Sequence, residues 1–303
     1  MKVFHPAQLH TLTSFYYFKD FDFDTEMNEK WFKGLERPVI FADSGAFSAK
    51  MKGEVISLDD YAQWVKRWSE WFKVYANLDV IGDPDATLRN QTILEDKYGL
   101  EPLPVFHLGS DMRYLEDYIK KGYTYIALGG MAIWSKFPKV LYPFLINAFR
   151  LTEEAGVMVH GFGVTNYKYL RSFRWFSVDS ITWLAGGKFN SVPLWDDKRK
   201  RLINFEPNRE WSLKEHAVSI RTMGFDPADF YLGGRKRHYF KVLLLGAASY
   251  WKAEHFLRDT MGVRTHPTYG DGLRIYLGDS IYWNNKSYKI VNVWRMALSY
   301  DEL

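Results

Sequence analysis

The sequence predicts an α/β protein built around a parallel sheet, and three observations support this prediction. Short apolar runs alternate with segments of helical periodicity from the N-terminus to about residue 200. The runs are continuously apolar, which is typical of parallel strands covered by helices. Polar residues follow the carboxyl ends of several runs, where the active sites of (β/α)8 barrels are built. A doubly wound sheet is the alternative, but its Gly-x-Gly-x-x-Gly turn is absent, so we expect a TIM-type (β/α)8 barrel.

Local signals place the strands and helices in order. Residues 38–42 form an apolar strand, and Ser57 is a suitable N-cap for a helix whose apolar face continues to Phe72. A strand around residues 76–81 follows, and Pro84 opens the next helix. Later strands are expected at residues 104–106, 123–128, 157–159 and 176–178, alternating with helices at residues 112–121, 137–155 and 166–175.

The rhythm changes near residue 200, which divides the chain into two parts. Residues 1–200 are expected to form the main part of the barrel with its active site. Residues 201–303 are expected to complete the barrel and to add a basic, aromatic extension of helices and short strands that contacts nucleic acid. In this part the pattern predicts helices at residues 212–223 and 238–260, and strands at residues 273–277 and 287–293.

The composition excludes several classes of site. The 303 residues include no cysteine, which rules out disulfides, cysteine nucleophiles and thiolate zinc sites. No run of about 18 apolar residues and no signal peptide is present, so we expect a cytoplasmic protein without a membrane partner. The net charge is +4, and aromatic residues make up 18% of the chain. Such an excess suits stacking on bases, although a large core also uses aromatic residues.

Carboxylates stand at the ends of two distant strands. Residues 43–48 read Asp-Ser-Gly-Ala-Phe-Ser, so a strand delivers Asp43, the hydroxyl of Ser44 and then Gly45, whose backbone can approach a ligand closely. Asp179 ends a later strand. Two carboxylates at one barrel mouth suit displacement at an anomeric carbon, with one as nucleophile and the other moving a proton. The structural alternatives are a simple turn at Asp43 and a helix cap at Asp179.

More candidate ligand-binding residues lie at the strand ends between these two. Asp79 or Asp83 is suited to accept hydrogen bonds from the amine and imide of a guanine-like edge. An Asp-Pro pair also commonly opens a turn or a helix, which is the alternative for Asp83. Gly129 and Gly130 place bare backbone against a flat ligand, or else they form a tight turn.

Basic residues are concentrated after the last of these strands. Lys188 comes first, followed by one cluster of Lys198, Arg199, Lys200 and Arg201 and a second of Arg235, Lys236 and Arg237. They are interpreted either as solvated surface or as phosphate contacts, because Lys and Arg supply most non-specific affinity for nucleic acids.

Four short segments agree in order and spacing with motifs of a known superfamily. Residues 43–48 resemble the Asp-Ser-Gly-Gly-Phe-Gln signature of the tRNA-guanine transglycosylases, and residues 128–132 (Leu-Gly-Gly-Met-Ala) their Gly-Gly-Leu-Ala loop. Residues 161–164 (Gly-Phe-Gly-Val) are similar to their Met-Gly-Val-Gly turn, and residues 178–179 (Val-Asp) to the start of their Val-Asp-Met-Phe-Asp segment. The agreement runs from about residue 38 to 190, roughly half of the chain.

The resemblance implies exchange of guanine for a 7-deazaguanine through a covalent glycosyl–enzyme intermediate. By position, Asp43 is the general acid and base, and Asp79 holds the Watson–Crick edge of the base. His107 falls near the family's base-contacting glutamine, and Phe162 takes the position of a stacking methionine. The residues expected to line the base site are Ser44, Gly45, Phe47, Asp79, Asp83, His107, Gly129, Gly130, Phe162 and Gly163.

Departures from the family pattern favour its DNA-modifying branch. Thr182 stands where the family usually has its nucleophile, Ala46 and Ser48 replace two signature residues, and the cysteines of the structural zinc site are missing. Residues 178–183 (Val-Asp-Ser-Ile-Thr-Trp) resemble the Val-Asp-Ser-x-x-Trp pattern of the DpdA-like branch, found in phage and bacterial 7-deazaguanine modification of DNA. That resemblance implies Asp179 as nucleophile, no zinc subdomain, and neither metal nor other cofactor.

The expected function is therefore a DNA-guanine transglycosylase. Its substrates are DNA and a free base such as 7-cyano-7-deazaguanine, with accessory proteins or a homo-oligomer as possible partners. The alternatives are a zinc-less tRNA-guanine transglycosylase, a non-catalytic nucleic-acid-binding paralogue prompted by Thr182, and an unrelated barrel enzyme acting on sugars.

Overall fold

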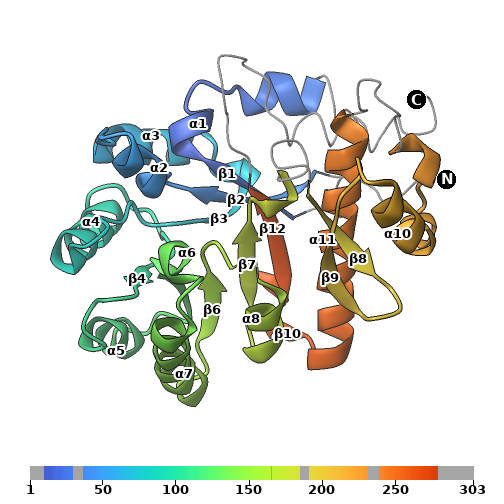
Figure 1. Cartoon of the computed structure of the whole chain (residues 1–303). Coiled ribbons are helices and arrows are strands. Elements are labelled where there is room, and N and C mark those ends of the chain that lie inside the picture. The colour runs from blue at the N-terminus through green and yellow to red at the C-terminus, as the bar shows by residue number, and fades with distance from the viewer. Residues whose placement is uncertain (1–9, 30–36, 165, 185–190, 231–238, 279–303) are drawn as a thin grey trace.

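The computed structural model describes residues 10–29, 37–164, 166–184, 191–230 and 239–278, and the fold is α/β (Figure 1). Its centre is a curled sheet of eight parallel strands, in the order β3-β2-β1-β12-β7-β6-β5-β4. The strands are β1 (His10–Ser14), β2 (Val39–Asp43), β3 (Phe72–Tyr75), β4 (Val105–His107), β5 (Tyr125–Gly129), β6 (Met158–Gly161), β7 (Ser177–Ser180) and β12 (Arg274–Gly278). Neighbouring strands follow one another along the chain, except that β12, which comes long after β7, lies between β7 and β1.

Backbone hydrogen bonds also connect the two outer strands of this order. Just past β3, Ala76 forms a parallel bridge with Leu103, which lies just before β4. The N–H of Asn77 donates to the Leu103 carbonyl at 2.9 Å, and the Leu103 N–H donates to the Tyr75 carbonyl at 2.8 Å. The segment just past β3 is therefore hydrogen-bonded to the segment just before β4.

Helices cover the outer face of the sheet (Figure 1). The helices of the described residues are α1 (Phe15–Phe18), α2 (Ala46–Met51), α3 (Leu58–Arg67), α4 (Pro84–Asp96), α5 (Arg113–Lys120), α6 (Met131–Trp134), α7 (Pro138–Glu154), α8 (Tyr167–Ser172), α10 (Glu210–Thr222) and α11 (Tyr239–Met261), with short helical turns at Asp24–Glu29, Ser69–Trp71, Thr182–Leu184 and Pro227–Asp229. Of these, α10 packs against the hairpin of β8 (Val192–Asp196) and β9 (Arg201–Phe205) instead of the eight-stranded sheet. None of the helices among the described residues is both long enough and apolar enough to cross a membrane.

Strands such as β2 and β5 are almost entirely apolar because both of their faces are buried. On β2, Ile40 packs into a large core with the helices, whereas the next residue, Phe41, belongs to a second cluster with Val105, Phe176 and Tyr276. Successive side chains of a strand point to opposite faces, so this second cluster fills the inside of the curl. Because the inside of the sheet is filled with side chains, a polar side chain of a strand can contact a ligand only near the end of that strand.

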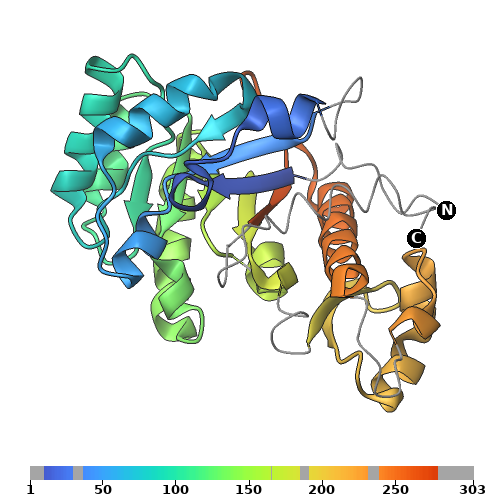
Figure 2. The ribbon, with the colours of Figure 1, turned by 90° about the horizontal axis from the view of Figure 1, so that it is seen from above.

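Between β7 and β12 the chain forms a separate layer beside the sheet (Figure 2). It contains an antiparallel hairpin of β8 (Val192–Asp196) and β9 (Arg201–Phe205), followed by α10 and α11. A second hairpin, β10 (Arg264–His266) with β11 (Gly270–Gly272), precedes β12. Residue 200, the expected boundary between the two parts of the chain, lies in the turn between β8 and β9.

Most expected elements are confirmed, but the region of the third strand was predicted wrongly. The helix that begins after Ser57, whose Oγ accepts the Asp60 N–H at 3.2 Å, ends at Arg67 instead of continuing to Phe72. A tight turn at Ser69–Trp71 ends the helical path, and Phe72 begins β3. The chain after Ala76, which was expected to be a strand, is a loop that carries Asp79. The strand expected at residues 287–293 lies outside the described residues.

Candidate active site

Five ionisable side chains gather at the carboxyl ends of the parallel strands. Asp43 ends β2, Asp79 follows β3, His107 ends β4, His160 lies near the end of β6, and Asp179 lies near the end of β7. Parallel strands present these ends on one side of the sheet, which is why residues far apart in sequence meet there.

The loop after β2 fixes Asp43 and Ser44. The Gly45 N–H donates to Asp43 Oδ2 at 3.0 Å, and Gly45 has a positive φ of 77°. A Cβ on Gly45 would lie 2.4 Å from both Ser14 Oγ and Tyr16 Cβ, so the chain's own β1–α1 junction already requires glycine here. The turn predicted at this motif is therefore present, and it aims the carboxylate over the sheet.

The pKa of the Asp43 carboxyl is strongly raised. Withdrawal of its carboxyl from water, followed by the negative charges of Asp79 and Asp179, raises its pKa to about 7. The backbone N–H groups of Gly45 and Ser44 act in the opposite direction without overcoming that shift. Because this pKa lies near neutral pH, Asp43 can serve as an acid in one step and as a base in another.

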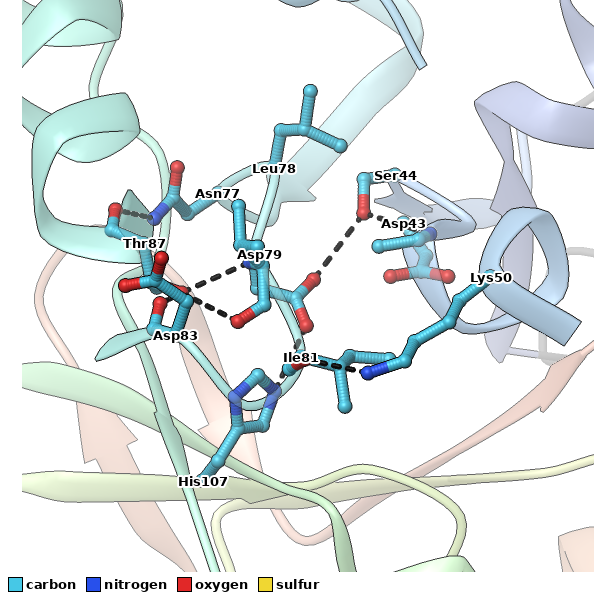
Figure 3. Close-up of polar contacts among 12 residues, drawn as sticks. Asp43, Ser44, Lys50, Asn77, Leu78, Asp79, Ile81, Asp83, Thr87 and His107 are labelled. Carbon is cyan, nitrogen blue, oxygen red and sulfur yellow. Dashed lines mark hydrogen bonds and ion pairs between the residues drawn. The ribbon is translucent and has the colours of Figure 1, made fainter. Parts of the chain in front are cut away.

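Asp79 is bound by groups from both neighbouring strand ends (Figure 3). His107 Nε2 lies 2.8 Å from Asp79 Oδ2, and the Ser44 hydroxyl donates to Asp79 Oδ1 at 3.4 Å. The His107 ring packs over Gly129, where a Cβ would lie 2.5 Å from His107 Cδ2. Figure 3 shows the carboxylates of Asp43 and Asp79 facing the same space. A carboxylate has about four acceptor positions, so Asp79 keeps capacity for a ligand.

Asp179 is positioned by the turn after β6. It is only 8% exposed, and its Oδ1 accepts the Gly163 N–H at 2.8 Å. The same oxygen lies 3.6 Å from His160 Nε2, beyond hydrogen-bond distance. Gly163, with φ of 67°, turns its N–H toward this carboxylate, and Phe162 packs edge-on to His160 with ring centroids 4.6 Å apart.

A buried hydrogen-bonded chain behind Asp179 was not predicted. The Tyr125 hydroxyl lies 2.5 Å from Ser177 Oγ, which lies 2.6 Å from His160 Nδ1. Burial lowers the pKa of His160, an effect partly offset by the Asp179 carboxylate, so the ring is neutral at pH 7. His160 directly follows the strand expected at residues 157–159. Its partners Ser177 and Tyr125 lie within other expected strands, where the sequence pattern does not distinguish a hydrogen-bonding side chain from a structural one.

The remaining predicted base-site residues differ in their placement. Asp83 accepts the Ala86 N–H at 2.8 Å and is exposed, so it caps α4 as the structural alternative proposed. Gly130, with φ of 75°, begins α6. Phe47 is 46% exposed on α2.

Exposed apolar side chains surround the strand ends. They lie in the segments that follow β2, β5 and β7, partly on α2 and α6, and they are Phe47, Ile133, Trp134, Phe137 and Ile181. The rings of Trp134 and Phe137 meet edge-on at 5.7 Å. Of this rim the motifs had indicated only Phe47, and the whole rim suits contact with flat ligands such as bases.

The first basic cluster occupies the turn of the β8–β9 hairpin. Arg199 pairs with Asp196 at 2.7 Å, and Lys200 pairs with Asp197 at 3.0 Å. Lys198 and Arg201 are exposed. Lys188, Arg235, Lys236 and Arg237 lie outside the described residues.

Comparison with known proteins adds no assignment. No family model matches the chain, and no curated protein matches it significantly. Within the described ranges, no group of three or more His, Asp or Glu side chains is arranged to hold a metal ion. The function must therefore be argued from the site itself.

Proposed function

We propose that this protein is a DNA-guanine transglycosylase that exchanges guanine for a 7-deazaguanine through an aspartyl–glycosyl intermediate. The observation that carries the proposal is the placement of Asp43 and Asp179 at the carboxyl ends of β2 and β7, on one side of the parallel sheet. Asp179 helps to raise the pKa of Asp43 to about 7, while its own carboxylate is oriented by the Gly163 N–H at 2.8 Å. One acid is thus suited to proton transfer and the other to attack on carbon.

The fold that we propose for this chemistry is a closed (β/α)8 barrel. The sequential strand order and the Ala76–Leu103 bridge between the outer strands support closure. In such a barrel the strand ends form one mouth, and the exposed rim of Trp134 and Phe137 would border it.

In the first half-reaction Asp179 attacks C1′ of the flipped deoxyguanosine. The C1′–N9 bond breaks, a C1′–O bond to Asp179 forms, and protonated Asp43 gives its proton to the departing guanine. In the second half-reaction the incoming base gives a proton to ionised Asp43 and its ring nitrogen attacks C1′, which releases Asp179. Two inversions give net retention, as in retaining glycosidases.

His160 acts here as a positioning residue. A neutral imidazole carries one N–H, and Ser177 can donate to Nδ1 when Tyr125 donates to Ser177. The proton of His160 then lies on Nε2, the nitrogen that is 3.6 Å from Asp179 Oδ1, and points toward that carboxylate. The opposite arrangement would set a nitrogen lone pair against a carboxylate, so the first is favoured.

Base recognition is assigned to Asp79 and the aromatic side chains. The exchanged base is flat, and its amine and imide N–H groups can donate hydrogen bonds to the Asp79 carboxylate. His107 holds that carboxylate in place, with Nε2 2.8 Å from Asp79 Oδ2. Extrusion of a base costs a few kcal/mol, and stacking on aromatic side chains returns about 1–3 kcal/mol per base.

The decisive experiment measures exchange of labelled guanine and labelled 7-cyano-7-deazaguanine into duplex DNA and into a stem-loop RNA. We expect wild type to incorporate label into DNA and Asp179→Ala to incorporate none. The exchange rate should fall at least about 100-fold in Asp43→Asn and stay at the wild-type level in Asp83→Asn, which alters only the helix cap. Label only in RNA would identify a zinc-less tRNA enzyme. An absence of label with both polymers would point to a binding paralogue, and full activity of Asp179→Ala would remove its assigned role.

A further inference from the structure

A large cleft lies between α8 and the β8–β9 hairpin. Its volume is about 1230 Å³, above the roughly 300–1000 Å³ of ordinary small-molecule pockets. Its walls come from α8, from the hairpin, from Thr182 and from Tyr250 on α11. The Tyr167 hydroxyl donates to the Lys200 carbonyl at 2.9 Å, so a direct bond fixes the hairpin to α8.

The charge of the cleft is positive. Lys168 and Arg171 project from α8, and Arg199 and Arg201 from the hairpin, whereas no Asp or Glu is among the described residues that line it. Arg199 is compensated by Asp196 at 2.7 Å. In the part of the chain that the structure describes, the other cations have no carboxylate within ion-pair distance, and all of them are exposed.

The cleft shares one wall with the segment that follows β7, the strand that carries Asp179. Thr182, on its wall, follows Asp179 by three residues and joins the end of β7 to the cleft. Neither Asp43 nor Asp179 lines the cleft, so it is a site for a part of the substrate that does not react. Figures 1 and 2 both show α8 and the hairpin side by side.

We propose that Lys168, Arg171 and Arg201 bind the phosphodiester backbone of the DNA strand whose base enters the mouth. The identity of the strand rests on the proposed function. Cations on opposite walls suit successive phosphates of one strand better than a single phosphate, and guanidinium groups bind phosphate oxygens in pairs. These cations are exposed and form no ion pair among the described residues, so binding costs little other stabilisation; Lys168 would give up only its contact with the Tyr142 ring, whose centroid lies 5.4 Å from Nζ.

The test uses fluorescence anisotropy with a labelled 12-nucleotide single-stranded DNA, titrated between 50 and 200 mM salt. The test variant is Lys168→Gln/Arg171→Gln/Arg201→Gln. The control, Lys120→Gln/Arg113→Gln/Arg150→Gln, removes the same charge from exposed positions on α5 and α7. We expect at least a tenfold loss of affinity for the test variant at 50 mM salt and a salt slope about 2 units less steep, with the control within threefold of wild type.

Equal losses in the two triple variants would overturn the proposal, because net charge alone would then explain binding. Competition by inorganic phosphate or a mononucleotide as effective as that by unlabelled 12-mer would also overturn it, since it would indicate a site for a single phosphate group. The labelled-base exchange assay separates this proposal from the proposed function. If the test variant alone loses DNA binding and neither wild type nor any variant exchanges label, the cleft is a DNA-binding site but the transglycosylase function is refuted. If wild type exchanges label and the test variant binds DNA as well as wild type, the function stands and the DNA-binding role of the cleft is refuted.

Discussion

The raised pKa of Asp43 predicts an unusual dependence of stability on pH. The native carboxyl holds its proton up to a pKa of about 7, whereas an ordinary aspartate releases it near 3.8. Between these values the native state binds more protons, so the free energy of unfolding falls as the pH rises. About 3 pH units at about 1.4 kcal/mol each give roughly 4 kcal/mol, which partial exposure of Asp43 to solvent reduces to about 2–4 kcal/mol.

Asp43→Asn removes this titration while leaving an oxygen to accept the Gly45 N–H. We expect the stability of the variant relative to wild type to rise by about 2–4 kcal/mol between pH 4 and pH 8. The assay is urea unfolding at each pH, followed through buried tryptophans such as Trp64 and Trp183. Asp83→Asn is the matched control, because it removes an exposed aspartate and keeps a capping side chain. Parallel curves for Asp43→Asn and wild type, or the same rise in the control, would refute the reasoning.

Two further substitutions test the surroundings of the site. Gly129→Ala places a Cβ 2.5 Å from His107 Cδ2; we expect a loss of about 1–3 kcal/mol in urea unfolding and a changed His107 signal in NMR spectra. Gly122→Ala, at a positive φ of 88° with no atom within 4 Å of the new Cβ, should leave that signal unchanged. Trp134→Ala should weaken binding of single-stranded DNA by about 5–100-fold, because 37% of the residue is exposed at the rim and its ring can stack on a base; loss of its edge-on contact with Phe137 should also lower stability. Trp211→Ala, 57% exposed on α10, is the control, and an equal effect of both would count against the rim.

The repeating part of the fold was predictable because its strands are buried on both faces and its helices have clear starts. The missed strands lack that signal. β1 reads His-Thr-Leu-Thr-Ser, and its buried Thr13 and Ser14 are polar. β8 contains Pro193, which argues against a strand in a sequence. Phe72 fits the helical spacing of α3, so periodicity alone could not show that the chain turns at Ser69–Trp71.

The positions of the site residues were predictable, but their pairings were not. A run that ends in a carboxylate marks a strand end, and this places Asp43 and Asp179 on one side of the sheet. Whether Asp79 meets His107, or His160 meets Ser177, depends on strand register and on which face each side chain takes. A continuously apolar strand gives no alternation from which that face can be read.

The different roles proposed for the carboxylates follow from what their neighbours supply. Asp79 contacts the His107 ring and accepts a hydrogen bond from the Ser44 hydroxyl. Asp179 accepts a hydrogen bond from the Gly163 N–H and lies beside the neutral ring of His160. Asp43 is withdrawn from water and, among the described residues, accepts hydrogen bonds only from N–H groups of its own loop while the charges of Asp79 and Asp179 oppose its ionisation, so a proton at Asp43 relieves both effects. Proton transfer is thus assigned to Asp43 by the arrangement of three strand ends, since the same Asp-Ser-Gly turn in isolation would hold an ordinary, ionised aspartate.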